Sequence, residues 1–485
     1  MSSIRSSFLF SSISQYLNKI LSFGFIVIIA RMLTPDELGL YAIATAVVVV
    51  ATEFRLMGAT NYLVRAETID RQTIRSGLGL TFCICWGMAL CVFLASSLIA
   101  SFYELEPLSV LFKILAIPFL FAPFISISAC LMTRDMHFHK IMIISLTSLC
   151  IKIGVSISLV WGGYSYYGLA WGLVIATVFE FVLYYFFRGE GVSWNPSFKG
   201  FKPIISFGIY NTLINALYRF ESSAPDVILG KVGTVRDVAL FSRGSGFLTF
   251  VNEMVTAGVW QVALPAMSKI KREGGDVNDG YVKASLLLGG LVLPVLAVSG
   301  VSAYPIILLI FGEQWVESVP VAQIIVGWVM LKSIHTLSTP LLISTENEKA
   351  ALLKQLIVFS ACIIAGIIAA PFGMFYMAWA MVFAGFVDLV TGSYILYRCL
   401  GIKPWLFLGS ILRNVLVALL CVIVAFALDW VLDFKTVEPI IAFICLALIM
   451  PPTWLACVFW VKHPLCTEIA GVMDFVKKRV KRNDR

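Results

Sequence analysis

The segment Ala30–Tyr41 reads ARMLTPDELGLY, and the segment Gly230–Phe241, GKVGTVRDVALF, repeats its pattern at an offset of 200 positions. The match extends without a gap over Ile13–Gly58 and Leu213–Gly258. Similar residues stand opposite one another in the two copies: Lys19 and Arg219, Ile28 and Ile228, Arg31 and Lys231, Thr34 and Thr234, Glu37 and Asp237, Leu38 and Val238, Leu40 and Leu240, Tyr41 and Phe241, Glu53 and Glu253, Gly58 and Gly258. Because the match includes loop residues, the sequence predicts an internal repeat.

Two of the matched ionisable pairs lie within predicted membrane spans. Lys19 and Arg219, like Glu53 and Glu253, lie inside long apolar runs, where a charge is costly and rarely accidental. A repeat with charge in both copies is typical of a two-lobed transporter whose site lies where the lobes face each other. The alternative is that the match reflects only the general similarity of membrane helices.

The amino-acid composition indicates a membrane protein. Of the 485 residues, 60% are hydrophobic and 13% are charged, with a mean hydropathy of +0.92, which excludes a soluble domain. The net charge of +8 is spread over short loops, so we expect no nucleic-acid partner. None of the 11 cysteines forms a C-x-x-C motif, so we expect no metal site, no cofactor and no disulfide framework.

A helix needs about 20 apolar residues to cross a bilayer. With that length the sequence predicts fourteen spans: 8–33, 38–58, 78–101, 108–132, 141–161, 167–187, 202–223, 237–260, 281–311, 319–345, 350–370, 373–397, 407–428 and 438–461. The first is too long for a signal peptide and is expected to be retained.

The expected fold is an all-α polytopic membrane protein with two pseudo-symmetric six-helix lobes and two extra C-terminal helices. The predicted domains are an N-terminal lobe, a C-terminal lobe, the two extra helices and a basic cytoplasmic tail: 1–200, 201–400, 401–465 and 466–485.

Lysine and arginine set the orientation, since short cytoplasmic loops retain them. Of the 36, 25 (Lys354 among them) fall on one side of the predicted spans and 5 on the other. This asymmetry predicts a multi-pass protein of the bacterial inner membrane with both termini in the cytoplasm.

Basic residues within the spans suggest an anionic substrate. Lys19 and Arg219 lie mid-span, where a cation costs about 3 kcal/mol or more and should face water or an anion. We expect both to line a central cavity and to bind a phosphate-bearing substrate. The alternative is neutralisation within the protein, for example by Glu53 or Glu221, in a structural role.

Further candidates follow from the same reasoning. Lys332 and His335 share one face of the tenth span and are predicted to line the cavity, before a break at Pro340; interhelical hydrogen bonding is the alternative. Glu53 and Glu253 are candidates for ion coupling, although they could instead close static salt bridges, and Asp388, a lone carboxylate in the twelfth span, is a further coupling candidate. The remaining substrate-binding candidates are Arg55 and Arg243.

Enzyme signatures are missing. The sequence contains no G-x-x-x-x-G-K-[ST], no G-x-S-x-G and no H-E-x-x-H, and the short loops leave no room for a catalytic domain. We therefore expect a protein that is not an enzyme.

The residues Gln15–Lys19 and Ile29–Tyr41 resemble the opening of the Wzx-type polysaccharide exporters, in which an "aRxLtp-eeyGlya"-like turn joins the first two helices. The second half agrees through Leu240–Gly244 and Val262–Lys269, and the latter resembles the "fPalSrl" segment of the subgroup related to colanic-acid and teichuronic-acid exporters. The resemblance spans essentially the whole chain and implies the multidrug/oligosaccharidyl-lipid/polysaccharide exporter superfamily.

The resemblance implies a flippase that moves an undecaprenyl-pyrophosphate-linked oligosaccharide, such as an O-antigen or exopolysaccharide unit, for cell-surface polysaccharide synthesis. It implies alternating access coupled to H⁺ or Na⁺, contact with membrane lipids and a polysaccharide polymerase as partner. Lys19 and Arg55 match the basic cavity residues of lipid II flippases, Arg243 is the candidate in the eighth helix, and the last two helices would hold the polyprenyl tail.

Two other functions were weighed. A multidrug antiporter of the same superfamily would need an acidic, aromatic cavity, whereas the candidates here are largely basic. A polysaccharide polymerase or ligase would need a large external loop, which the predicted topology lacks.

Overall fold

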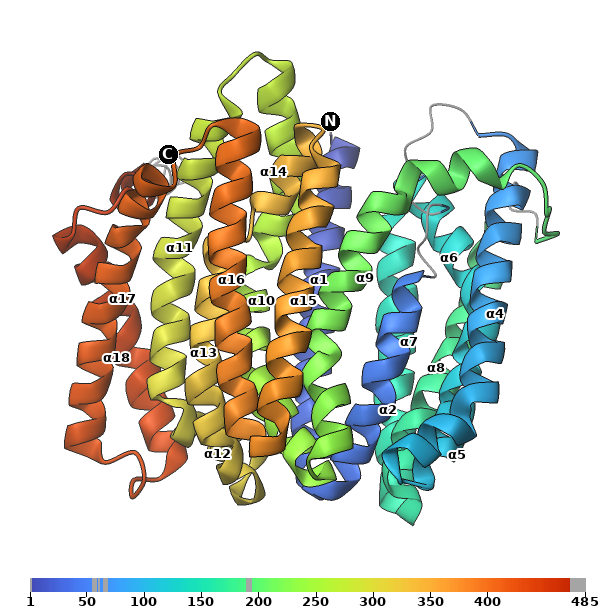
Figure 1. Cartoon of the computed structure of the whole chain (residues 1–485), viewed down its shortest axis with the longest axis horizontal. Coiled ribbons are helices and arrows are strands. Elements are labelled where there is room, and N and C mark those ends of the chain that lie inside the picture. Colours follow the sequence, from blue (N-terminus) through green and yellow to red (C-terminus); the bar gives the residue numbers. More distant parts are fainter. Residues whose placement is uncertain (1, 55–58, 60–61, 64–68, 189–193, 472–485) are drawn as a thin grey trace, which may run out of the picture. The chain divides into compact units, whose positions relative to one another are not determined.

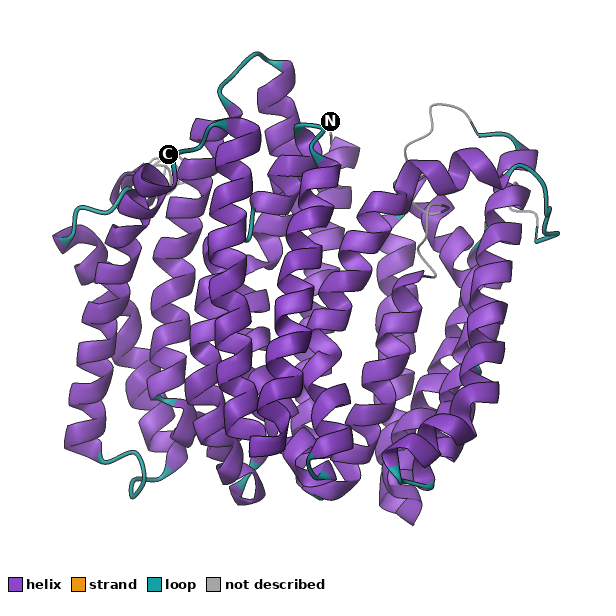
Figure 2. Ribbon diagram, in the orientation of Figure 1, coloured by secondary structure: helices purple, strands orange, loops and turns teal. Residues whose placement is uncertain are grey.

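The computed structural model describes residues 2–54, 59, 62–63, 69–188 and 194–471. Within these residues the regular structure is helical and no strand occurs (Figure 2). The chain forms two compact units. Unit 1 comprises Met1–Ser242 and Cys362–Met377, and unit 2 comprises Arg243–Ala361 and Ala378–Arg485.

Unit 1 holds the helices labelled α1 to α9, the beginning of α10 and the segment where α15 meets α16 (Figure 1). Its helices are α1 (Ser2–Met32), α2 (Pro35–Phe54), α4 (Arg71–Tyr103), α5 (Pro107–Ala116), α6 (Pro118–Arg134), α7 (Phe138–Leu159), α8 (Ser165–Phe187) and α9 (Phe201–Val232), with a π-helical turn, η1 (Val160–Tyr164), between α7 and α8.

Unit 2 holds most of α10 and the remaining helices. They are α10 (Val235–Arg272), α11 (Val277–Val301), α12 (Ala303–Phe311), η2 (Glu313–Ser318), α13 (Val319–Ile334), α14 (Ser338–Ser344), α15 (Glu348–Ala369), η3 (Ala370–Phe372), α16 (Met374–Leu400), α17 (Pro404–Leu432) and α18 (Pro439–Trp460).

The helices coincide with the predicted spans wherever the chain is described. Among the described residues, eleven segments are long and apolar enough to cross a membrane, and one of them, Phe138–Phe187, contains both α7 and α8. The helices α9 and α10 are outside this set, yet at 32 and 38 residues they are long enough to cross. The prediction of an all-α polytopic fold is confirmed, whereas the domain boundaries at 200, 400 and 465 stay a prediction.

The two copies of the repeat start their second helix in the same way. The main-chain N–H and the hydroxyl of Thr34 donate to Glu37 Oε2 at 2.8 and 3.0 Å, and Glu37 N–H donates back to Thr34 Oγ1 at 3.3 Å. Thr234 and Asp237 make the same three bonds, at 3.0, 2.7 and 3.1 Å. Each is a reciprocal helix cap that satisfies N–H groups left over at a helix start. The sequence repeat is therefore also a repeat of local structure.

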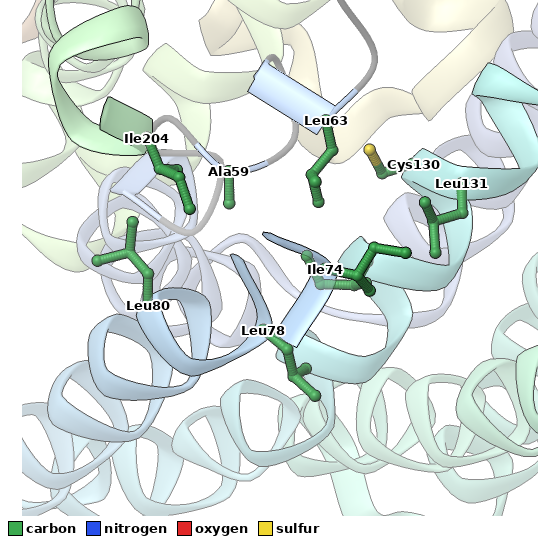
Figure 3. Packing of buried hydrophobic residues seen from close by; sticks show 9 residues of the cluster. Ala59, Leu63, Ile74, Leu78, Leu80, Cys130, Leu131 and Ile204 are labelled. Carbon is green, nitrogen blue, oxygen red and sulfur yellow. The ribbon is translucent and has the colours of Figure 1, made fainter. Parts of the chain in front are cut away.

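One hydrophobic core of unit 1 lies where α4, α6 and α9 meet. Its buried members, most of them labelled in Figure 3, are Ala59, Leu63, Ile74, Leu78, Leu80, Ile127, Cys130, Leu131 and Ile204. Because these side chains come from segments far apart in the sequence, their packing fixes the start of α4 against the start of α9.

In unit 2 the last two helices pack on the rest of the unit through α11. The indole of Trp454 in α18 donates to the carbonyl of Gly290 at 2.9 Å. A Cβ at Gly289 would lie 2.3 Å from the amide nitrogen of Asn414, so only glycine permits this approach of α11 and α17. The extra helices are thus closely packed parts of unit 2.

Candidate functional site

In unit 1 the two predicted charges Arg219 and Glu53 form one ion pair. Arg219 Nε lies 3.0 Å from Glu53 Oε1, which joins α9 to α2. The carboxylate side chain is only 14% exposed, whereas the arginine side chain is 50% exposed. The neutralisation considered as the structural alternative is therefore present, but the guanidinium carries further N–H donors on an exposed side chain.

Lys19, the counterpart of Arg219 in the first copy, lies partly buried on α1. The preceding residue, Asn18, fixes this part of the helix. Its amide donates to Ser14 O at 2.8 Å and to Ser145 Oγ at 3.3 Å, which ties α1 to α7. The structure thus places Lys19 next to a polar contact between two helices of unit 1.

In unit 2 the carboxylate of Asp388 is paired with Lys354. Lys354 Nζ lies 2.8 Å from Asp388 Oδ1, and the two side chains are only 7% and 6% exposed. The ammonium group also donates to Ser338 Oγ at 3.2 Å, at the first residue of α14. The sequence reasoning counted Lys354 as a loop residue, which is wrong: it lies in α15, and the buried carboxylate of α16 supplies the partner that makes burial possible.

His335 is held between two hydroxyl groups beside this pair. Its Nδ1 lies 2.8 Å from Tyr281 OH, and its Nε2 lies 2.8 Å from Ser393 Oγ. The ring stacks on Phe407 at 5.0 Å between centroids, and Phe407 stacks on Tyr281. Four helices or helix ends thus contribute to one buried cluster around a single imidazole.

The helix that carries His335 is broken there, as the proline predicted. α13 ends at Ile334 and α14 begins at Ser338, with Pro340 in the first turn of α14. A proline has no N–H to donate and fits the first turn of a helix. The break brings the imidazole of His335 and the hydroxyl of Ser338 into the same buried cluster.

Two further predicted cations of unit 2 lie over indole rings. Lys332 Nζ is 5.1 Å from the ring of Trp328, and the guanidinium of Arg243 is 5.5 Å from the ring of Trp315. Such contacts stabilise a cation in an apolar setting by about 0.5–2 kcal/mol. Both residues are therefore held by aromatic rings, in a way that leaves an anion-binding role possible.

Two predicted residues remain. Glu253 is exposed on α10, and Arg55 lies outside the described residues. Within the part of the chain that the structure describes, no group of three or more His, Cys, Asp or Glu side chains could hold a metal ion.

Sequence reasoning missed three members of the buried cluster: Lys354, Tyr281 and Ser393. Tyr281 is fully buried and Ser393 is 9% exposed. A signal for Lys354 does exist, since apolar residues flank it on both sides in Leu352–Lys354 and Leu356–Phe359. Tyr281 and Ser393 carry no such signal, because tyrosine and serine are common in membrane helices.

The chemistry of the two sites is similar. Each unit pairs a carboxylate with a cation inside its helices, Glu53 with Arg219 and Asp388 with Lys354. An anion that binds the cation competes with the carboxylate, and so does a proton that neutralises the carboxylate. Of the two pairs, only that of unit 1 has a substantially exposed cation, so it is the more accessible to a ligand.

These observations define a multi-pass, all-helical membrane protein with paired charges among its helices. Residues 28–320 match the family described as "Polysaccharide biosynthesis protein", and the chain belongs to that family. The resemblance drawn from the sequence is thereby confirmed.

Named relatives agree with this assignment. Teichuronic acid biosynthesis protein TuaB of Bacillus subtilis (strain 168) is 21% identical over 347 residues, which cover 70% of this chain and 71% of that protein. Lipopolysaccharide biosynthesis protein WzxC of Escherichia coli (strain K12) is 21% identical over 413 residues, which cover 81% of this chain and 79% of that protein.

Solved structures show the fold. The lipid II flippase MurJ in an inward closed conformation matches with a TM-score of 0.74 at 14% identity, over 95% of this chain and 100% of that chain. An inward-facing multidrug resistance MATE family transporter of the MOP superfamily matches with a TM-score of 0.63 at 11% identity, over 82% of this chain and 94% of that chain.

Proposed function

We propose that this protein is a flippase that moves an undecaprenyl-pyrophosphate-linked oligosaccharide across the bacterial inner membrane for cell-surface polysaccharide synthesis. Family membership supports the polysaccharide context. The observation that carries the substrate class is Arg219, a half-exposed guanidinium in an apolar helix, because a pyrophosphate is the kind of group that such a fork of donors binds.

The head group is the part of the substrate that is hardest to move across a membrane. A sugar pyrophosphate loses its water if it enters hydrocarbon, and that loss is prohibitive unless polar groups replace the water. Arg219 and Lys19 of unit 1 supply positive charge to the pyrophosphate in this proposal, with Arg55, Arg243, Lys332 and His335 as further substrate-binding candidates. The polyprenyl tail stays in the lipid.

Coupling to H⁺ or Na⁺ would act through the carboxylates. In unit 1 Glu53 and the pyrophosphate share the guanidinium of Arg219, so the charge on Glu53 affects substrate binding. In this proposal Glu53 carries a proton inward in exchange for the substrate. The other candidates for ion coupling are Asp388, which is paired with Lys354, and Glu253. In this proposal the chain acts as a transporter and not as an enzyme.

Alternating access requires two lobes, and we assign them to the predicted segments 1–200 and 201–400, with the helices of 401–465 holding the tail. The predicted orientation has both termini in the cytoplasm, so a polymerase that uses the flipped unit would act on the opposite side of the membrane. The repeated helix caps at Thr34 and Thr234 support the derivation of both lobes from one ancestral unit.

The test is transport by the purified protein in proteoliposomes. A lipid-linked oligosaccharide with a pyrophosphate is loaded in the inner leaflet, and its exposure outside is followed with a glycan-oxidising reagent that cannot cross the membrane. We expect protein-dependent exposure. Exposure no faster than in empty liposomes, together with export of an organic cation, would favour the multidrug antiporter; joining of oligosaccharide units would favour the polymerase or ligase.

A further inference from the structure

A second polar site lies in unit 1, at the start of α4. A cavity of about 200 Å³ is enclosed by the first turns of α4, the start of α9 and the segment Asn195–Gly200, which we name the strap. Gln72, Ser76 and Lys199 are among the residues that line it. It shares no residue with the ion pairs described above.

The strap is firmly attached to α4. Ser197 N–H donates to the carbonyl of Arg75 at 2.9 Å, and Arg75 Nε donates to the carbonyl of Asn195 at 3.1 Å. Gln72 Nε2 donates to Ser197 Oγ at 2.9 Å. A Cβ at Gly79 would lie 2.1 Å from the carbonyl oxygen of Ser197, so the strap follows α4 as closely as a glycine allows. Lys199 is thereby held at the edge of the cavity.

The cavity is rich in hydrogen-bond donors. The main-chain N–H groups of Arg71 and Gln72 belong to the first turn of α4 and have no acceptor within the helix. Ser76 is 4% exposed and lines the cavity. A serine hydroxyl can donate one hydrogen bond, so Ser76 adds a donor to the lining.

The charge around the cavity favours an anion. Lys199 lines it, and Arg71 and Arg75 are on the adjacent turn of α4. The nearby carboxylate of Asp70 is engaged as the helix cap, since it accepts the main-chain N–H of Thr73 at 2.8 Å and the threonine hydroxyl. Because these three cations outnumber the one carboxylate, which is already engaged as a cap, the charge around the cavity is net positive.

Aromatic side chains on the strap and further along α4 indicate a lipid. Phe198 of the strap is 58% exposed and Trp86 of α4 is 43% exposed. Phe82 lies between them, with its ring centroid 4.2 Å from that of Trp86 and 6.4 Å from that of Phe198. An apolar surface beside a phosphate-sized polar cavity fits a molecule with a charged head and a hydrocarbon chain.

We propose that this cavity binds the phosphate group of an anionic membrane lipid, whose acyl chain lies against Phe198 and Trp86. Lys199 contributes the positive charge, and Ser76 and the first N–H groups of α4 donate hydrogen bonds to the phosphate oxygens. This site is separate from the proposed substrate site, and its test does not depend on transport.

The experiment measures lipid binding to the full-length protein in detergent by native mass spectrometry and by thermal shift. The probes are phosphatidylglycerol, phosphatidylcholine and inorganic phosphate. The variants are Lys199→Gln and Ser76→Ala, and Lys140→Gln is the control, because Lys140 is a cation of unit 1 that does not line the cavity. Lys199 is exposed, so its variant should fold normally.

We expect phosphatidylglycerol to bind the parent and Lys140→Gln equally, and to bind Lys199→Gln about ten-fold more weakly, the usual loss for one charge-assisted hydrogen bond. Ser76→Ala should weaken binding less. Inorganic phosphate that binds as well as the lipid would overturn the lipid assignment. Equal binding of phosphatidylglycerol to the parent and to both cavity variants would overturn the site itself.

Discussion

The ammonium group of Lys354 lies 2.8 Å from the carboxylate of Asp388, with both side chains almost completely buried between α15 and α16. Such a pair recovers the cost of desolvating two charges only while both partners are present. Ser338 supplies a further hydrogen bond to the ammonium at the break between α13 and α14. The pair therefore stabilises unit 2 and also fixes the position of its broken helix.

The first prediction concerns this pair. Lys354→Met or Asp388→Leu alone should reduce the stability of the protein by about 3–5 kcal/mol, because each leaves one buried charge without its partner. The double variant should recover much of the loss, since it buries no charge. Unfolding in detergent, followed for the two single variants and the double variant, measures these changes in stability. A double variant no more stable than the worse single variant would contradict the account.

The second prediction concerns Glu53. Glu53→Gln removes the carboxylate that competes for Arg219, so a pyrophosphate-bearing lipid should bind about two- to five-fold more tightly, as expected for loss of an exposed ion pair worth roughly 0.5–1 kcal/mol. Titration of the reconstituted protein with the lipid measures the affinity. Weaker binding would mean that Glu53 holds Arg219 in its productive position instead of competing for it.

The ion pairs Glu53–Arg219 and Asp388–Lys354 show how much of the structure can be predicted from the sequence. The helices follow from the length of the apolar runs, and Glu53, Arg219 and Asp388 are conspicuous as charges inside them. The sequence offers Glu53 and Glu221 as partners for the cations but does not choose between them, because Glu53 and Arg219 are 166 residues apart and their contact depends on how α2 packs on α9. Lys354 is missed since it follows a helix start, where a lysine usually reaches water.

The third prediction concerns the strap. Gly79→Ala should detach it from α4 and destabilise unit 1 by about 1–3 kcal/mol, because the new Cβ would overlap the carbonyl of Ser197. Gly87→Ala in the same helix is the matched control, since nothing lies within 4 Å of its Cβ position. Limited trypsin digestion should cleave Gly79→Ala faster after Lys199. Equal cleavage of the two variants would refute the tight contact.

The fourth prediction concerns pH. His463 lies beyond the end of α18 and bonds Asn414 Oδ1 at 2.6 Å through Nε2, while its Nδ1 accepts Leu465 N–H at 3.1 Å. Burial, with the charge of Arg413 as a lesser cause, holds the pKa of His463 below its usual value of 6.5. The unfolded chain therefore binds a proton near pH 6.5, whereas the folded protein does not. The free energy of unfolding thus falls as the pH drops below that value.

Thermal unfolding between pH 7.5 and pH 5 measures this loss in the parent and in His463→Gln. The variant should be less stable at pH 7.5, because it loses the packing of the imidazole, but its stability should decline less as the pH falls. A decline of the same size in both proteins would show that other groups cause the pH dependence.

The most direct test of the central claim, that the charge of Arg219 binds the pyrophosphate of the substrate, is the flipping rate in proteoliposomes for Arg219→Gln. Lys231→Gln is the control, because Lys231 is also on α9 and also ion-paired, at 3.0 Å to Glu104. Lys19→Gln tests the counterpart of Arg219 in the first copy. We expect correctly inserted and folded Arg219→Gln to flip the lipid ten-fold or more slowly than the parent, because it loses about 1.4 kcal/mol or more of interaction with a charged group. Lys231→Gln should keep the parent rate. Parent rates in both Arg219→Gln and Lys19→Gln would contradict the central claim and make the two matched charges structural.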